Sequence, residues 1–177
     1  MMRTRTTYLL DANSFITPSR QYYAFDFASG FWRQFKKALL QNDVLLLDLV
    51  RDEITKGKND ELAAWLAGVM KEIPILQRSE QAVFQAYQSK VWPKVQECGY
   101  YTEKAIKSWA HGQVADIWLI AAALAHKGTI VTFEQSVGFR SLHHKTNKIK
   151  IPDVAKDVGV PCVNLFAFMR DKKIKWT

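Results

Sequence analysis

The stretch TYLLDANSF, residues 7–15, places an apolar run directly before an aspartate. Residues 7–11 have the short, continuous apolar character that is typical of a buried strand in a parallel sheet. Asp11 stands where this strand ends, and Asn13 and Ser14 follow it. In open α/β sheets, ligands bind beyond the carboxyl ends of the strands. Asp11 is therefore either a cap for the following turn or the first carboxylate of a functional site.

The rest of the chain alternates strand-like and helix-like segments. Short apolar runs predict further strands at residues 44–47, 73–76, 129–133 and 148–152, with a last one inside 161–173. Apolar spacing predicts helices over residues 30–42, 49–57, 60–72, 79–110 and 113–128, the last of them nearly all apolar and buried. We expect Gly57 to end the second helix, and Pro93 and Gly99 to interrupt the fourth. The alternation predicts a single α/β domain over residues 1–177, with helices flanking a mainly parallel sheet.

Charge and composition narrow the class of partner. Lys and Arg number 25 against 17 Asp and Glu, a formal charge of +8. This excess favours an anionic partner such as nucleic acid, and an ordinary basic surface is the alternative. Cys98 and Cys162 are far apart and indicate neither a disulfide framework nor a zinc ribbon, so we expect a reducing cytoplasm. The longest uncharged apolar run, residues 117–125, is well short of the roughly 20 residues that span a bilayer.

Acidic residues recur at the predicted edge of the sheet. Glu53 lies in the helix after the second strand, Asp116 in the first turn of the most apolar helix, and Glu134 directly after the strand TIVTF. Carboxylates that converge raise one another's pKa, and a divalent cation removes that cost. Mg²⁺ and Mn²⁺ prefer oxygen ligands and can activate water toward a phosphate ester. These three acids and Asp11 therefore predict a metal-dependent phosphodiester site, with ordinary helix caps as the alternative.

The contexts of these four acids resemble the motifs of the PIN-domain ribonucleases. The acids fall, in order, in YLLDANSFI, LVRDEITKG, VADIWLIAAAL and VTFEQS, across nearly the whole chain. YYAFDFASGFW, VTFE and KIKIPDV are similar to standalone PIN-like proteins that resemble VapC-type toxins. The resemblance implies a three-layer PIN-like fold with Mg²⁺ or Mn²⁺ as cofactor, and its catalytic, metal-binding residues would be Asp11, Glu53, Asp116 and Glu134. PIN nucleases usually carry Asp at the fourth position, and the longer Glu134 would reach the metal directly or through water.

The resemblance also implies a function and partners. It implies an endoribonuclease that hydrolyses RNA phosphodiester bonds and leaves a 5′-phosphate and a 3′-hydroxyl. The protein would be the toxin of a type II toxin–antitoxin pair with a cognate antitoxin. Dimers are common among the proteins it resembles, so a homodimer and a monomer are both open, and the short apolar runs predict no membrane association. A catalytically weak or inactive PIN-like nucleic-acid-binding module is the alternative. An aspartyl-phosphate phosphatase is disfavoured because Asn13 stands where its second acid is needed, and no Gly-rich loop suggests a dinucleotide.

Other residues are predicted to assist these acids. Asn13, Ser14 and Thr132 would donate hydrogen bonds to the ligands or to phosphate, and turn formation after a strand is the alternative. The basic segment RSLHHKTNKIK predicts an RNA-contacting loop, with a solvated loop as the alternative; its candidate contacts are Arg140, His143, His144, Lys145 and Lys148. Asp153 is predicted to be the N-cap of the helix that follows.

Overall fold

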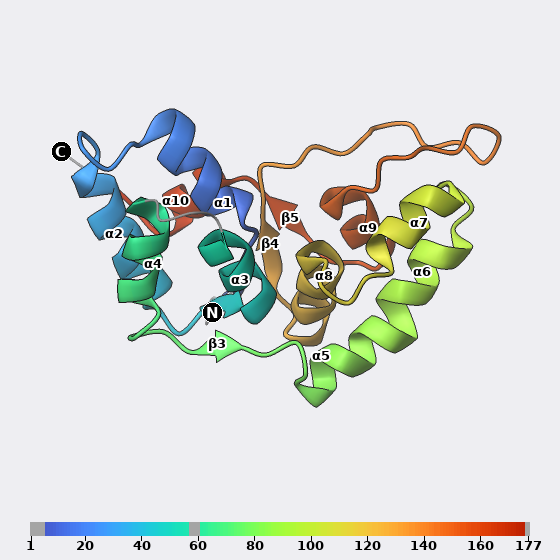
Figure 1. Cartoon of the computed structure of the whole chain (residues 1–177), viewed down its shortest axis with the longest axis horizontal. Coiled ribbons are helices and arrows are strands. Elements are labelled where there is room, and N and C mark those ends of the chain that lie inside the picture. Colours follow the sequence, from blue (N-terminus) through green and yellow to red (C-terminus); the bar gives the residue numbers. More distant parts are fainter. Residues whose placement is uncertain (1–5, 57–60, 176–177) are drawn as a thin grey trace, which may run out of the picture.

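The structure, a computed structural model, describes residues 6–56 and 61–175 (Figure 1). Its strands form one sheet in the order β3-β2-β1-β4-β5, and every pairing is parallel. The strands are β1 (Tyr8–Leu10), β2 (Val44–Leu47), β3 (Ile75–Leu76), β4 (Thr129–Val131) and β5 (Cys162–Val163). The central strand β1 is fully buried, as the apolar run before Asp11 predicts.

Helices cover both faces of this sheet. The helices are α1 (Asn13–Thr17), α2 (Ser29–Leu39), α3 (Asp48–Lys56), α4 (Glu61–Val69), α5 (Gln81–Ala86), α6 (Trp92–Glu97), α7 (Glu103–Trp109), α8 (Ala115–Ala125), α9 (Ile151–Asp157) and α10 (Leu165–Asp171), with π-helical turns η1 (Pro18–Tyr22) and η2 (Tyr87–Val91). Figure 1 shows α2, α4 and α10 on one side of the strands and α6, α8 and α9 on the other. The predicted α/β architecture around a parallel sheet is confirmed.

Helix α8 occupies the centre of one layer, where it packs against β1, β4 and α5. Residues 117–123 are all buried, which explains why the helix has no polar face. At its end, the N–H of Gly128 donates to the carbonyl of Ala123 at 2.8 Å. A Cβ at Gly128 would lie 2.4 Å from Cδ1 of the buried Leu9, so any side chain here would force Leu9 of β1 to shift. Since the end of α8 lies beside the start of β1, its first turn lies at the carboxyl edge of the sheet.

Aromatic side chains fill the opposite layer. The ring of Phe35 on α2 lies 5.4 Å from that of Phe15 and 6.3 Å from that of Phe168 on α10. Phe168 in turn meets Tyr8 of β1 edge-on, with ring centroids 5.1 Å apart. Such offset and edge-to-face contacts add to the burial of apolar area. They fix α2 and α10 to the central strand.

One predicted strand is wrong. Residues 148–152 alternate basic and apolar side chains, as an edge strand does, but α9 begins at Ile151. Pro152 takes the second helical position, where its missing N–H costs nothing. Ile151, Val154 and Ala155 are buried at helical spacing. Burial against the sheet therefore decides for a helix.

The expected break at Pro93 is also wrong. The chain continues from α5 through the π-helical turn η2 into α6, where Pro93 is the second residue. The wider π turn directly before the proline accommodates its ring. Gly99 does end this helical run, with a positive φ of 74°. Gly57 lies outside the described residues, and within those residues no helix is long and apolar enough to cross a membrane.

Candidate functional site

The four predicted acids reach the same edge of the sheet. Asp11 directly follows β1, and its N–H donates to the carbonyl of Val131 at the end of β4. Glu134 follows β4, while Asp116 is the second residue of α8 and Glu53 lies on α3. Helix α8 contacts β1, β4 and α3, so these elements carry the acids toward one another. The topology therefore brings the acids to the carboxyl ends of the strands, where open α/β sheets bind their ligands.

Asp11 is the most buried of the four, with 3% of its surface exposed. Its Oδ2 accepts a hydrogen bond of 2.8 Å from the hydroxyl of Thr132. Burial, together with the charges of Glu134 and Glu53 and against the hydrogen bond from Thr132, raises the pKa of Asp11 to about 6. The ionised carboxylate is therefore destabilised in the folded protein, and a nearby cation would relieve this cost.

Asp116 is half-buried in the first turn of α8, where the helix dipole favours an anion. Burial first, and then the charges of Asp11, Glu134 and Glu53, raise its pKa to about 7. None of the hydrogen bonds found between described residues uses its carboxylate. Glu53 is exposed as a residue, yet desolvation of its carboxylate still raises its pKa. The three acids on β1, α3 and α8 thus form one electrostatically coupled group.

Glu134 differs from the other acids because both of its carboxylate oxygens are engaged. Oε1 accepts a bond of 2.6 Å from the ammonium of Lys150, and Oε2 accepts one of 2.9 Å from the backbone N–H of Ile151. The carboxylate therefore caps the start of α9 from a distant segment. The sequence places Lys150 only within the basic segment RSLHHKTNKIK, and its position among other basic residues gives no signal that it meets Glu134.

The residues present fit a hard divalent cation in their chemistry. Asp11, Glu53 and Asp116 offer only carboxylate oxygens, the ligands that Mg²⁺ and Mn²⁺ prefer. The rise in the pKa of each shows that the protein holds them where their ionised forms are costly. Across residues 6–56 and 61–175, no three side chains of His, Cys, Asp or Glu already stand close enough to enclose a metal.

The three predicted supporting residues have different surroundings. The hydroxyl of Thr132 links two acids, since it donates to Asp11 and accepts the N–H of Glu134 at 3.0 Å. Ser14 is fully buried and donates to the carbonyl of Val131 at 2.8 Å, so its hydroxyl holds the turn after β1. Asn13 begins α1, and within the described part of the chain no hydrogen bond found uses its side-chain amide.

The basic loop between β4 and α9 is anchored to the body by Arg140. The guanidinium makes two hydrogen bonds to Asp157, of 2.6 and 2.7 Å, and lies 4.8 Å from the ring centroid of Tyr100. Its side chain is only 13% exposed, so Arg140 is not one of the loop's surface cations. The exposed candidates for RNA contact are His143, His144, Lys145 and Lys148.

Asp153 also anchors this loop and is not the N-cap that its position in the sequence suggests. It is the third residue of α9, 2% exposed, and accepts hydrogen bonds from the hydroxyl of Ser136 and the N–H of Val137. Lys150 occupies the N-cap position instead. The start of the loop is therefore held beside the acids, and Figure 1 shows the rest of it extending past α7.

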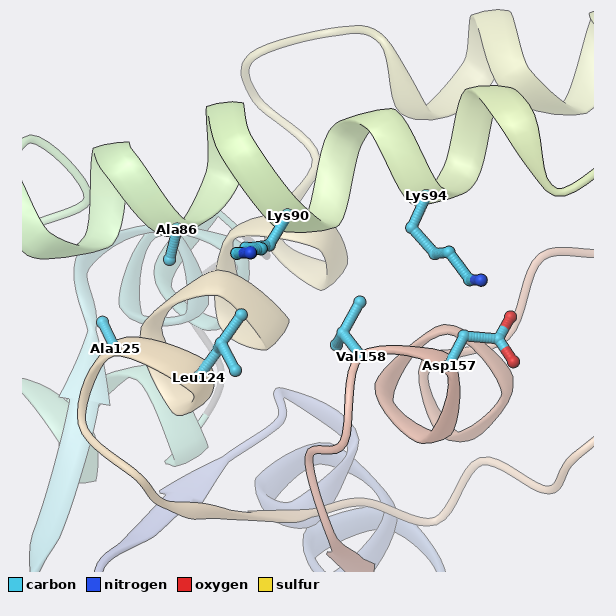
Figure 2. Close-up of a pocket in the computed structure, with 7 residues that line it drawn as sticks. All are labelled: Ala86, Lys90, Lys94, Leu124, Ala125, Asp157 and Val158. Atoms are coloured by element: carbon cyan, nitrogen blue, oxygen red, sulfur yellow. The ribbon is translucent and has the colours of Figure 1, made fainter.

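Of two cavities in the surface, one borders the acids of the candidate site and the other does not. A cavity of about 280 Å³ at the ends of β4 and β5 is lined by Thr132, Glu134 and Asn164, among others. A larger one of about 510 Å³ lies against η2 and α6, where Lys90 and Lys94 reach over it (Figure 2). None of the predicted site residues lines the larger hollow. The smaller cavity is the one that borders the candidate site.

Comparison with known proteins supports the fold and shows the family. The crystal structure of VapBC2 from Rickettsia felis, bound to a DNA fragment from their promoter, is similar over 90% of this chain and 98% of that chain, with a TM-score of 0.55 and 13% identity. At this identity the likeness shows the fold alone, and it confirms the predicted three-layer PIN-like fold. A search of curated proteins finds no match. The family model described as domain of unknown function (DUF4411) matches residues 8–176, and the chain belongs to that family.

Proposed function

We propose that this protein is an endoribonuclease that depends on Mg²⁺ or Mn²⁺ and hydrolyses RNA phosphodiester bonds. The observation that carries the proposal is the coupled carboxylate group at the sheet edge. Asp116 has its pKa raised by burial and by Asp11, Glu53 and Glu134, which lie on three other segments. A protein that gathers costly carboxylates at the carboxyl ends of parallel strands is suited to binding a divalent cation there.

Each residue has a proposed role in this chemistry. Asp11, Glu53 and Asp116 would hold the ion, and Thr132 would keep the Asp11 carboxylate oriented through its 2.8 Å bond. Glu134 is the proposed fourth acid, although Lys150 and Ile151 occupy its oxygens in this arrangement. When bound, the ion would polarise a water molecule and the scissile phosphate.

We further propose that the protein is the toxin of a type II toxin–antitoxin pair with a cognate antitoxin. The likeness of its fold to VapBC2 supports this setting, as does the similarity of YYAFDFASGFW, VTFE and KIKIPDV to standalone PIN-like proteins that resemble VapC-type toxins. The net charge of +8 and the exposed cations of the basic loop suit an RNA substrate, because phosphate neutralisation supplies much of the affinity for nucleic acid.

RNA cleavage tests the enzymatic proposal. With Mn²⁺ or Mg²⁺, the wild-type protein is expected to cut RNA, and EDTA or Asp11→Asn should lower the rate by about a hundredfold or more, because several kcal/mol of charge stabilisation are lost. Asp52→Asn is the matched control: Asp52 is paired with Arg51 at 2.6 Å on the same helix as Glu53. Cleavage that survives in Asp11→Asn would show that the carboxylate group is not the active site.

One observation favours the alternative of a weak or inactive nucleic-acid-binding module. The Lys150 ammonium lies at Glu134 and its charge also acts on Asp116, so a cation already partly neutralises the acids. In that case the protein would bind RNA in the cleavage assay but leave it intact with either metal ion. The same experiment therefore separates the two functions.

Growth on expression tests the toxin proposal. Expression of the wild-type protein in a bacterial host is expected to slow growth, and Asp116→Ala should relieve the effect because it removes a proposed metal ligand. Immunoblots must show equal amounts of both proteins, since a lower level of the variant would mimic relief. Equal toxicity of the two would contradict a toxin that acts through this site.

A further inference from the structure

The Lys150 side chain projects a positive charge into the acidic group from the start of α9. Its ammonium lies 2.6 Å from Oε1 of Glu134, and the charges of Asp116 and Asp11 also act on it. The side chain is 34% exposed, whereas that of Glu134 is 16% exposed. An ammonium group carries three N–H donors, and the bond to Glu134 uses one of them. Lys150 can therefore present donors to a ligand that enters from solvent.

Hydrogen bonds to the carboxylate of Glu134 hold the Lys150 side chain in this position. Glu134 accepts the N–H of Ile151 at the same time as the Lys150 ammonium, so one carboxylate holds both the side chain and the helix start. Thr132 accepts the N–H of Glu134 and donates to Asp11, which links the pair to the most buried acid. A continuous set of hydrogen bonds thus runs from Asp11 through Thr132 and Glu134 to Lys150.

We propose that the Lys150 ammonium contacts the RNA phosphate beside the carboxylates, and that Glu134 is the positioning residue that holds it there. This inference rests on the proposed function, because it assigns a substrate contact within the same site. An anionic substrate that approaches several carboxylates meets repulsion, and a fixed cation at the rim lowers that barrier. Glu134, which holds this cation, also lines the cavity of about 280 Å³ at the ends of β4 and β5.

RNA binding without metal tests the contact directly. A labelled single-stranded RNA is titrated in EDTA, so that no cleavage occurs, and fluorescence anisotropy gives the Kd at several salt concentrations. Lys150→Met is expected to weaken binding about fivefold and to reduce the slope of log K against log salt by about 0.7, the value for one lost contact to a single strand. Lys150→Arg keeps the charge and should retain the wild-type slope.

The chain offers a matched control in Lys36, which pairs with Glu72 and has a side chain 36% exposed. Lys36→Met removes the same charge and the same kind of ion pair from α2, and it should leave the slope unchanged. Thermal unfolding of each variant checks that the fold is retained. An unchanged slope in Lys150→Met, or an equal loss in Lys36→Met, would overturn the assignment of Lys150.

A double-mutant cycle in the cleavage assay tests the role of Glu134. If Glu134 acts by holding Lys150, Glu134→Gln should slow cleavage in the wild-type background and have little further effect when Lys150→Met is present. The metal concentration for half-maximal activity should stay the same in Glu134→Gln. Additive losses, or a clearly weaker response to metal, would overturn the positioning role and favour direct metal binding by Glu134.

Failure of this inference can be told apart from failure of the proposed function. Wild-type protein that neither binds nor cleaves RNA would overturn both. Wild-type protein that cleaves RNA with metal, with Lys150→Met binding RNA as tightly as wild type, would overturn only the role of Lys150. Specific loss of affinity in Lys150→Met, restored in Lys150→Arg, supports it.

Discussion

Replacing Asp116 with asparagine is expected to stabilise the metal-free protein at about pH 8 while slowing RNA cleavage about a hundredfold or more. The folded protein raises the pKa of Asp116 from 3.8 to about 7, chiefly by burial and then by the charges of Asp11, Glu134 and Glu53. Each unit corresponds to about 1.4 kcal/mol, but solvent screens a half-buried group, so we expect a gain of about 2 kcal/mol. Asparagine has the same shape without the charge.

The gain should depend on pH with a definite sign. Below the unfolded pKa of 3.8, Asp116 is protonated in both states and its charge costs nothing. As the pH rises toward about 7, the unfolded chain releases the proton while the folded protein retains it, so wild-type stability falls. The advantage of Asp116→Asn should therefore appear between these values and stay constant above them.

Urea unfolding in EDTA at several pH values measures the gain in the free energy of unfolding. The cleavage assay measures the loss of activity. The same variant should cut RNA about a hundredfold or more slowly, because it removes a proposed ligand of the ion. Asp52→Asn, which breaks a partly exposed pair with Arg51, should change stability little at any pH. A variant that is less stable than wild type at high pH, or equally stabilised at low pH, would contradict the electrostatic account of the site.

Millimolar Mn²⁺ or Mg²⁺ is expected to raise the free energy of unfolding at about pH 8 by about 2 kcal/mol, since an ion that binds only the folded state stabilises it by mass action. For a chain of this length the melting temperature should rise by roughly 5 °C. Because Asp116 and Asp11 have pKa values of about 7 and about 6, protons compete with the ion as the pH falls. The metal-induced rise should therefore shrink at mildly acidic pH.

Differential scanning fluorimetry with and without metal checks this expectation. Sodium chloride at the same ionic strength controls for general screening, and Asp11→Asn should lose most of the rise. A rise of the same size in Asp11→Asn would place the ion elsewhere on the protein. No rise in the wild type at high pH would count against the carboxylates as a metal site.

Much of the fold could be predicted because local burial patterns determine it. Strand β2 (Val44–Leu47) coincides with the predicted run 44–47, since a continuous apolar stretch between polar residues suits a strand that is covered on both faces. Helix α8 lies inside the predicted segment 113–128 for the same reason. Local information is insufficient where a strand pattern and a helix pattern overlap. Residues 148–152 alternate as a strand does, but a helix begins at Ile151 because α9 packs against α8 and β5.

Local patterns were enough to predict that Asp11 ends a buried strand and that Asp116 lies in the first turn of a buried helix, because apolar runs and the chain positions of acids are local properties. The central place of that strand in the sheet is known only from the strand order. The contacts of Lys150 with Glu134 and of Arg140 with Asp157 depend on the folded path of the chain. Each of these pairs is brought together by the path of a long loop. Residues of one sign are interchangeable in a local pattern, whereas an ion pair forms only between the two groups that the folded backbone places within hydrogen-bonding distance.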